Sequence, residues 1–560
     1  MTISKKALGA VALTASALLA LSACGKGNTT TPTTTTTSVA APVTSTTSAP
    51  PTSAAPSTAS SAAAKYLSDA GVAVPVTLNI QYNPDHYGSS SDQEYGLIKQ
   101  QLEATGLFKV NLQSTEWVTY NKERVKDAYP IFQLGWFPDF PDADNYLTPF
   151  FAPNNFVSNH FDTDTLPAIA DVQAKIAAEV TETDAAKRQA IIEDIQKVLA
   201  QQFLPTIPLL QGSQWAVART NVSDVNLLVS DELMFTPLKS SAKPDIILGT
   251  TDKIYTIDPA GSYDHGSLVV ETQVYQFLVN FNKGDKAPTP DAAESCSFTA
   301  PKVFTCKLKA GLKFANGHDL TSSDVKFSFD RVKKINDPNG PASLLGNLDT
   351  VDAPDPLTVN FNLTAENDQT FAQVLATSAG PIVDEQVFPA DALMPDEDIV
   401  KANAFSGPYT ITDFTKNDVL TLVPYAAYNG GLTKPAQSKI TYKTFTEASN
   451  LRLSISNGDI DVAYRSLTPT DIEALQKDAN VKVWQEKGGE IRYIVFNLKT
   501  MPGDTAEQKL AIRQAIASSI DRDALSQNVY KGQYTPLCSY VPDGFVGASK
   551  AVCDAYPLGK

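Results

Sequence analysis

Alternation of apolar and polar residues predicts strands and helices that follow one another along most of the chain. The segment VPVTLNIQY, residues 74–82, has a period of two, and so does KVNLQSTEW, residues 109–117, which is typical of half-buried strands. Between them, residues 93–105 show helical spacing. A longer amphipathic helix is predicted over 184–202, and Pro205 and Pro208 just beyond it close the helix.

The alternation of predicted strands and helices continues after residue 245. IILGTT, residues 246–251, predicts a strand, hairpin-rich stretches follow it, and residues 506–517 predict another helix. Because helices and strands alternate, we expect an α/β protein. A chain of 560 residues is longer than a single hydrophobic core accommodates, so it should divide into two or three lobes.

The beginning of the sequence has the layout of an export signal. Lys5 and Lys6 precede an apolar run over residues 7–20, which is too short for a membrane span. The ending Leu-Ser-Ala-Cys looks like a bacterial lipobox, so cleavage before Cys24 would leave a lipid on its sulfur. An ordinary secretory signal with a chance cysteine is the alternative. We expect a lipid-anchored protein on the outer face of the cytoplasmic membrane.

Composition separates a tether from the folded part and excludes some partners. Residues 25–64 are almost entirely Thr, Ser, Ala and Pro, which cannot bury a core and indicate an extended tether. The formal charge of −16 leaves no basic surface for phosphate backbones, so we expect no nucleic-acid partner.

The cysteines fit an exported protein. The chain has five, and lipidation of Cys24 leaves four. Two local disulfides are the simplest pairing, Cys296 with Cys306 and Cys538 with Cys553, and buried free thiols are the alternative. No metal-type Cys/His spacing occurs and the four histidines are scattered, so no metal site and no cofactor are predicted.

Several longer segments carry a family resemblance. The most specific is LKAGLKFANGHDLTSSDVKFSFDRV, residues 308–332, in which Asn316 and Gly317 form a turn and Thr321 caps a helix. FSGPYTITDF from Phe405, LRLSISNGDIDVAY from Leu451, and RYIVFN followed by AIRQAIASSIDRDAL extend the pattern. Together they resemble the family 5 extracellular solute-binding proteins of dipeptide, oligopeptide and nickel ABC importers, over nearly all of residues 65–560.

The order of these segments departs from the family pattern. GWFPDFPDADNYLTPFF, residues 135–151, belongs near the family's carboxyl end, yet it precedes the family's amino-terminal strand, which here begins at Ile246. We therefore predict a circular permutation. It joins the customary ends around residues 238–245 and opens new ends at Lys65 and Lys560; a gene-assembly artefact is the alternative.

The resemblance implies a type II periplasmic-binding-protein-like fold, with two lobes joined by a hinge and an extra subdomain. We predict a signal peptide over 1–23 and a lipidated tether over 24–64. The folded part then follows in this order: lobe 2 over 65–211, lobe 1 over 212–272, its subdomain over 273–381, the return of lobe 1 over 382–488, and the rest of lobe 2 over 489–560.

The resemblance also suggests ligand contacts. Asp139 stands where peptide-binding relatives place the aspartate that meets the ligand's α-ammonium; a loop or capping role is the alternative. Trp136, Phe137 and Phe140 are candidates for the pocket wall, or else for core. The weaker candidates fall where relatives approach the cleft: Tyr263, Asp264, His265 and Arg465. Of these, Arg465 suits a peptide carboxylate, with an ordinary surface arginine as the alternative.

These features predict a monomer that captures short peptides by lobe closure and delivers them to an ABC permease with cytoplasmic ATPases. An oligosaccharide or chelated nickel is the alternative solute. No GxSxG, HExxH or GxxxxGK[ST] motif occurs, so no enzyme activity is predicted. A secreted hydrolase or a passive cell-surface protein is the alternative from another class.

Overall fold

The computed structural model describes residues 58–555, except residues 85, 89, 154, 156, 229–231 and 466. The predicted signal peptide, Cys24 and most of the predicted tether lie outside these described residues. The first helix, α1 (Thr58–Asp69), begins inside the segment assigned to the tether. Ala63 and Leu67 are buried in α1, which packs on α13 (Ala506–Ser519), so tertiary packing extends this helix beyond its predicted start.

One mixed sheet of eleven strands dominates the described part. Its order is β16-β17-β18-β9-β19-β4-β20-β3-β1-β2, and β21 pairs with β4. Its strands are β1 (Val76–Tyr82), β2 (Phe108–Ser114), β3 (Ile131–Trp136), β4 (Thr206–Arg219), β9 (Asp245–Thr250), β16 (Tyr409–Thr415), β17 (Val419–Pro424), β18 (Lys439–Thr444), β19 (Val462–Tyr464), β20 (Val481–Phe496) and β21 (Thr535–Pro536).

A second sheet has four strands in the order β12-β13-β15-β14. Its strands are β12 (Ala293–Ala300), β13 (Val303–Leu308), β14 (Leu348–Asp355) and β15 (Thr358–Leu363). Cys296 and Cys306 lie directly opposite each other in the β12–β13 hairpin and form a disulfide. Cys538 and Cys553 form the other, so both predicted pairings are confirmed.

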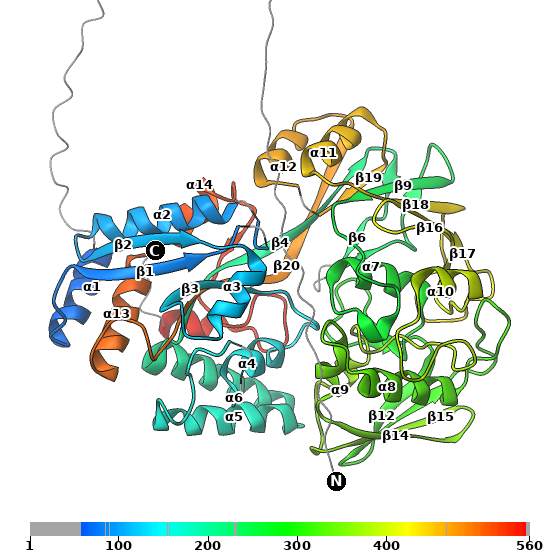
Figure 1. Ribbon diagram of the computed structural model, residues 1–560, viewed down its shortest axis with the longest axis horizontal. Coiled ribbons are helices and arrows are strands. Elements are labelled where there is room, and N and C mark those ends of the chain that lie inside the picture. Colours follow the sequence, from blue (N-terminus) through cyan, green and yellow to red (C-terminus); the bar gives the residue numbers. More distant parts are fainter. Residues whose placement is uncertain are drawn as a thin grey trace, which may run out of the picture. The chain divides into compact units, whose positions relative to one another are not determined.

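Three short strand pairs and the helices complete the fold (Figure 1). The pairs combine β5 (Val222–Ser223) with β8 (Lys239–Ser240), β6 (Asn226–Leu227) with β7 (Leu233–Met234), and β10 (Val279–Asn280) with β11 (Thr289–Pro290). The other α-helices are α2 (Ser90–Ala104), α3 (Trp117–Arg124), α4 (Asp144–Phe151), α5 (Ala170–Thr181), α6 (Ala185–Val198), α7 (His265–Val274), α8 (Ser322–Ile335), α9 (Phe371–Val374), α10 (Asp396–Ala402), α11 (Ala448–Asn457), α12 (Pro469–Leu475) and α14 (Arg522–Asn528). Short turns of helix are η1 (Pro167–Ile169), η2 (Leu199–Phe203), η3 (Pro259–Gly261), η4 (Pro341–Leu345) and η5 (Lys550–Ala555).

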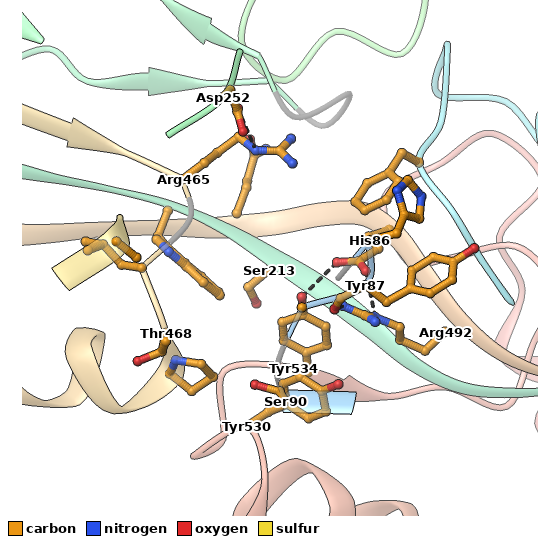
Figure 2. A pocket seen from close by; sticks show the side chains of 18 residues that line it. His86, Tyr87, Ser90, Ser213, Asp252, Arg465, Thr468, Arg492, Tyr530 and Tyr534 are labelled. Carbon is orange, nitrogen blue, oxygen red and sulfur yellow. Dashed lines mark hydrogen bonds and ion pairs between the residues drawn. The ribbon is translucent and has the colours of Figure 1, made fainter. Parts of the chain in front are cut away.

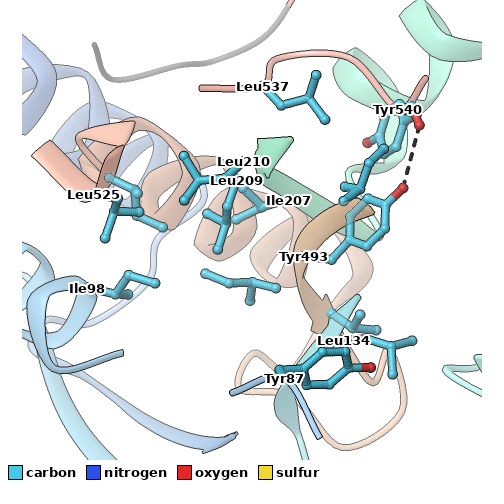
Figure 3. Close-up of a cluster of buried hydrophobic side chains, with 14 of the residues drawn as sticks. Tyr87, Ile98, Leu134, Ile207, Leu209, Leu210, Tyr493, Leu525, Leu537 and Tyr540 are labelled. Carbon is cyan, nitrogen blue, oxygen red and sulfur yellow. Dashed lines mark hydrogen bonds between the residues drawn. The ribbon is translucent and has the colours of Figure 1, made fainter. Parts of the chain in front are cut away.

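The buried apolar side chains form three cores. The first core draws on residues 63–217 and 451–552, so it combines the two ends of the described chain. In Figure 1 the blue helix α1 accordingly lies beside the orange helix α13, and Figure 3 shows Ile98, Leu134, Leu209 and Leu525 in this core. The second core lies mostly in residues 228–382, and the third joins residues 216–275 to 383–464.

Local signals in the sequence are realised in two of the helices. The Asp184 side chain accepts from the backbone N–H groups of Ala186 and Lys187 and so caps α6. In α8, Thr321 accepts from the N–H of Ser323, and the Asp324 side chain accepts from the N–H of Thr321. This reciprocal capping box satisfies backbone donors that the first turn leaves unpaired. Within the described residues, the search for a helix long and apolar enough to cross a bilayer finds none.

Candidate functional site

A cavity of about 460 Å³ lies where strands β4 and β20 pass between the cores (Figure 2). This volume falls within the range of roughly 300–1,000 Å³ that is usual for small-molecule sites. The residues that line it are His86, Tyr87, Gly88, Ser90, Phe137, Ser213, Gln214, Trp215, Asp252, Ala448, Arg465, Leu467, Thr468, Pro469, Glu490, Arg492, Tyr530 and Tyr534. They come from both parts of the first core and from segments next to the third.

Strand β20 supplies one charged pair. Its register against β4 shifts between Lys487 and Ile491, and the Gly-Gly-Glu segment inside that irregularity brings Glu490 to the cavity. The Arg492 Nε lies 2.6 Å from the Glu490 Oε1. A Cβ on Gly212 of β4 would come within 2.8 Å of the Glu490 Oε2, so this glycine makes room for the carboxylate.

Aromatic residues hold this pair in place. The Tyr534 hydroxyl donates to the Glu490 Oε2 at 2.7 Å, and the Arg492 Nη2 donates to the carbonyl oxygen of Tyr87 at 2.8 Å. The guanidinium carbon lies 5.3 Å from the Tyr87 ring centroid and 5.8 Å from that of Tyr534. Tyr530 stacks on Tyr534 at 4.1 Å. The cavity floor is therefore rigid and aromatic, and its charge is neutralised in place.

A second carboxylate lies behind this floor. Glu94 on α2 is fully buried, and the Tyr530 hydroxyl donates to its Oε2 at 3.1 Å. Burial raises the pKa of Glu94 to about 7, against the opposing effect of the Arg492 charge. Glu94 therefore titrates near neutral pH.

The opposite wall carries another charged pair. The Arg465 Nε lies 3.2 Å from the Asp252 Oδ2, and the Arg465 guanidinium carbon lies 5.8 Å from the Phe137 ring centroid. Arg465 directly follows β19 and has a φ of +60°, a left-handed backbone conformation that aims this residue away from the strand. The lining holds two carboxylates, Asp252 and Glu490, and two guanidinium groups, Arg465 and Arg492. Their charges cancel, and His86 is a further ionisable side chain in the described lining.

Asp139 lies outside the lining of this cavity. Its Oδ2 accepts from the Asn145 Nδ2 at 3.0 Å, and its Oδ1 accepts from the Tyr263 hydroxyl at 2.5 Å. Burial raises the pKa of Asp139, while these two hydrogen bonds act in the opposite direction. Trp136 donates its Nε1 to the Asn145 Oδ1 at 2.9 Å. The structure thus brings Asp139 and Trp136 together around Asn145, and Tyr263 contacts this group through Asp139.

The other predicted contacts are spread over different surroundings. Phe137 and Arg465 line the cavity, whereas Phe140 is buried in the second core. Asp264 caps α7 by accepting from the N–H of Ser267. His265 starts that helix, and its Nδ1 lies 3.7 Å from the Asp252 Oδ2.

Sequence reasoning missed the residues that form most of the polar surface of the cavity. Glu490 and Arg492 are two residues apart within an apolar strand, so their side chains point to the same side of β20. That pairing of opposite charges was the available signal. Trp215, Tyr530 and Tyr534 gave none, because buried aromatic residues are typical of any core.

Comparison with known proteins identifies the class. The description of the matching family is "Bacterial extracellular solute-binding proteins, family 5 Middle", and the match covers residues 25–158 and 287–557. The chain belongs to this family of solute-binding proteins, and its fold is the mixed α/β type predicted from the sequence.

The probable D,D-dipeptide-binding periplasmic protein of Escherichia coli (strain K12) is 30% identical over 319 residues, which is 56% of this chain and 60% of that protein. The glutathione-binding protein of the same strain is 25% identical over 303 residues, 54% of this chain and 57% of that protein. The matches thus span about three fifths of the curated relatives' length. A solved oligopeptide-binding protein from Bacillus subtilis, in complex with a nonapeptide, has a TM-score of 0.36 and 20% identity over 42% of this chain and 46% of that one.

Proposed function

We propose that this protein is the extracytoplasmic binding component of an ABC importer and that it captures short peptides. The observation that carries the proposal is the cavity beside β4 and β20, with one neutralised carboxylate–guanidinium pair on each side. A short peptide is a zwitterion, so it adds no net charge to such a cavity. The names of the two curated relatives agree with this solute class.

Capture would use closure around the solute. Arg465 and Phe137 are proposed as direct contacts, with Arg465 facing the solute's carboxylate. Asp139 and Tyr263 are proposed to hold the closed arrangement, because their hydrogen bond joins segments 124 residues apart. Closure is favoured only as far as the solute binds the closed state more tightly than the open one. A permease with cytoplasmic ATPases would then receive the peptide.

The membrane attachment belongs to the same proposal. Lipidation of Cys24 would keep the protein at the outer face of the membrane, with residues 25–57 as a spacer. Expression in a lipoprotein-processing bacterium, followed by intact-mass measurement, tests it directly. The mature protein should begin at Cys24 and carry a diacylglycerol, and Cys24→Ser should appear in the soluble fraction without this added mass.

A screen of solutes tests the proposed function. Thermal-shift measurements on the purified protein would compare defined mixtures of di- to hexapeptides, malto-oligosaccharides and nickel–histidine complexes. We expect stabilisation by peptides, since a ligand that binds only the folded state raises its stability. Stabilisation by sugars or nickel complexes without any by peptides would exclude the peptide assignment. Hydrolysis of the peptides during the assay would instead favour an enzyme.

A further inference from the structure

Six buried side-chain polar atoms of residues that line the cavity have no hydrogen-bond partner among the described residues, and three of them belong to the two ion pairs described above. The other three are the Arg492 Nη1, the Trp215 Nε1 and the Gln214 Oε1. Their residues all line the cavity, and they are 4%, 8% and 5% exposed, respectively. Buried polar groups are nearly always hydrogen-bonded, because an unpaired one loses its bond to water without replacement. Three such atoms around one cavity therefore indicate that a solute supplies their partners.

Arg492 and Trp215 both lie beside the ring of Tyr534. The guanidinium carbon of Arg492 lies 5.8 Å from the Tyr534 ring centroid, and the ring centroids of Trp215 and Tyr534 lie 6.4 Å apart. Gln214 precedes Trp215 on β4 and already donates its Nε2 to the carbonyl oxygen of Leu228, which leaves its Oε1 as an acceptor. A solute that lies against Tyr534 is therefore beside residues that together hold two N–H donors and one acceptor without partners.

The charges around Arg492 determine what kind of solute group can bind there. Arg492 is already neutralised by Glu490, and Glu94 lies in the same buried cluster. An incoming carboxylate would add an uncompensated negative charge beside these two carboxyl groups, which is costly in a buried site. An uncharged group adds no such charge and still pairs with the free donors.

We propose that Arg492, Trp215 and Gln214 form a subsite for the uncharged backbone of the solute, separate from the groups that bind its charged ends. The subsite takes polar groups that combine an acceptor oxygen with a hydrogen donor. A peptide group has this chemistry, because it carries one C=O acceptor and one N–H donor. For a peptide solute the inference rests on the proposed function, whereas the donors and the acceptor would also accept the hydroxyl groups of a sugar.

A pair of tryptophan variants tests the subsite in the full chain. Trp215→Phe removes the indole N–H and keeps an aromatic ring. Trp484→Phe is the matched control, because the Trp484 Nε1 is also buried without a partner in the described structure but Trp484 does not line the cavity. Calorimetric titration with trialanine and with maltotriose would be carried out on both variants and on the wild type. We expect Trp215→Phe to weaken binding about 3- to 10-fold and Trp484→Phe to leave it unchanged.

The outcomes separate the two proposals. Equal affinities of the two variants for trialanine overturn the subsite and leave the peptide function standing. Binding of maltotriose alone, weakened only by Trp215→Phe, overturns the peptide function and supports the subsite. If neither these probes nor any peptide of the screen binds the wild type, both proposals are contradicted. Thermal midpoints of the unliganded variants show whether either substitution has disturbed folding.

A measurement of solute binding by the wild type gives a second test. The chain has four tryptophans, so its indole ¹H–¹⁵N resonances are few, and the single-residue variants assign those of Trp215 and Trp484. Saturation with trialanine should move the Trp215 resonance downfield as its N–H gains an acceptor and leave that of Trp484 in place. An unmoved Trp215 resonance at saturation would overturn the subsite.

Discussion

Glu94, Glu490 and Arg492 are ionisable side chains with almost no exposed surface, and they lie together beneath the cavity. Removing two carboxylates and a guanidinium from water is costly, and their mutual attraction together with the hydroxyl donors of Tyr530 and Tyr534 offsets part of that cost. At the scale of single residues, the cavity floor is thus kept polar by charges that depend on one another. Such a cluster makes stability sensitive to pH.

Glu94→Gln should remove one part of this pH dependence. Burial raises the pKa of Glu94 to about 7, whereas an unfolded glutamate titrates near ~4.3. Because the folded pKa is the higher one, ionised Glu94 destabilises the folded state at high pH, and this effect fades as the pH falls from about 7 towards 4.3. We compare the free energy of unfolding of the variant with that of the wild type at each pH. This difference should favour the variant by roughly 2–3 kcal/mol more at pH 8 than at pH 5.

Denaturant unfolding at both pH values measures this difference. Glu507→Gln is the control, since Glu507 is exposed on α13 and its carboxylate stays in water. A gain that is the same at pH 5 and pH 8 for Glu94→Gln would contradict the assignment of the titration to Glu94.

Tyr263→Phe should weaken solute binding, although Tyr263 is not one of the residues that line the cavity beside β4 and β20. The substitution removes the hydroxyl that donates to the Asp139 Oδ1 at 2.5 Å. Since Tyr263 is 39% exposed, we expect a modest effect, an affinity about 3- to 10-fold lower for the tightest peptide from the screen. Tyr255→Phe is the control, because Tyr255 is also exposed and its hydroxyl accepts a hydrogen bond from Asn339 instead of donating one to Asp139. Calorimetric affinities that match for the two variants would exclude a role for Asp139–Tyr263 in closure.

At the scale of elements, β4 and β20 position the site. They pair along most of their 14 and 16 residues, and each contributes to the cavity where the β20 register is irregular. Helix starts follow local sequence signals, as the predicted Thr321 cap of α8 illustrates. Helix and strand identity was therefore predictable from spacing, whereas the early start of α1 came from packing on α13.

Thr321→Ala should destabilise α8 by about 1 kcal/mol. The variant loses the hydroxyl that accepts from the N–H of Ser323 and keeps the backbone N–H that Asp324 accepts from. Thr321→Ser retains the hydroxyl and should remain within a few tenths of a kcal/mol of the wild type. Denaturant unfolding of the three proteins measures the effect, and equal stability of the alanine and serine variants would contradict it.

At the scale of the whole molecule, the first core joins both ends of the described chain. The cavity residues Glu490, Arg492, Tyr530 and Tyr534 come from the last part, and His86 and Phe137 come from the first. The family match falls in two separate stretches, residues 25–158 and 287–557, and the circular permutation remains a proposal that rests on the order of the sequence segments. Under that proposal, the link over residues 238–245 replaces the customary ends.

Reversing the permutation tests it. A chain in which Lys560 is joined to Lys65 and new ends are opened between Ala242 and Lys243, both exposed, should fold and bind the screened peptide within about 3-fold of the wild type. A chain ending at Asp504 should lose binding, because it lacks Tyr530 and Tyr534. Circular dichroism and calorimetry measure both. An unfolded rejoined chain would contradict the permutation.

The sequence by itself determined the α/β class, the family, the disulfide pairs and the cap of α8. Each of these depends on residues that are close in sequence or on motifs that are read along the chain. The cavity depended on tertiary structure, because Arg492, Trp215 and Tyr534 lie on separate elements and meet only through sheet pairing and packing. Periodicity tells which residues share a face of a strand, but not which partner that face meets.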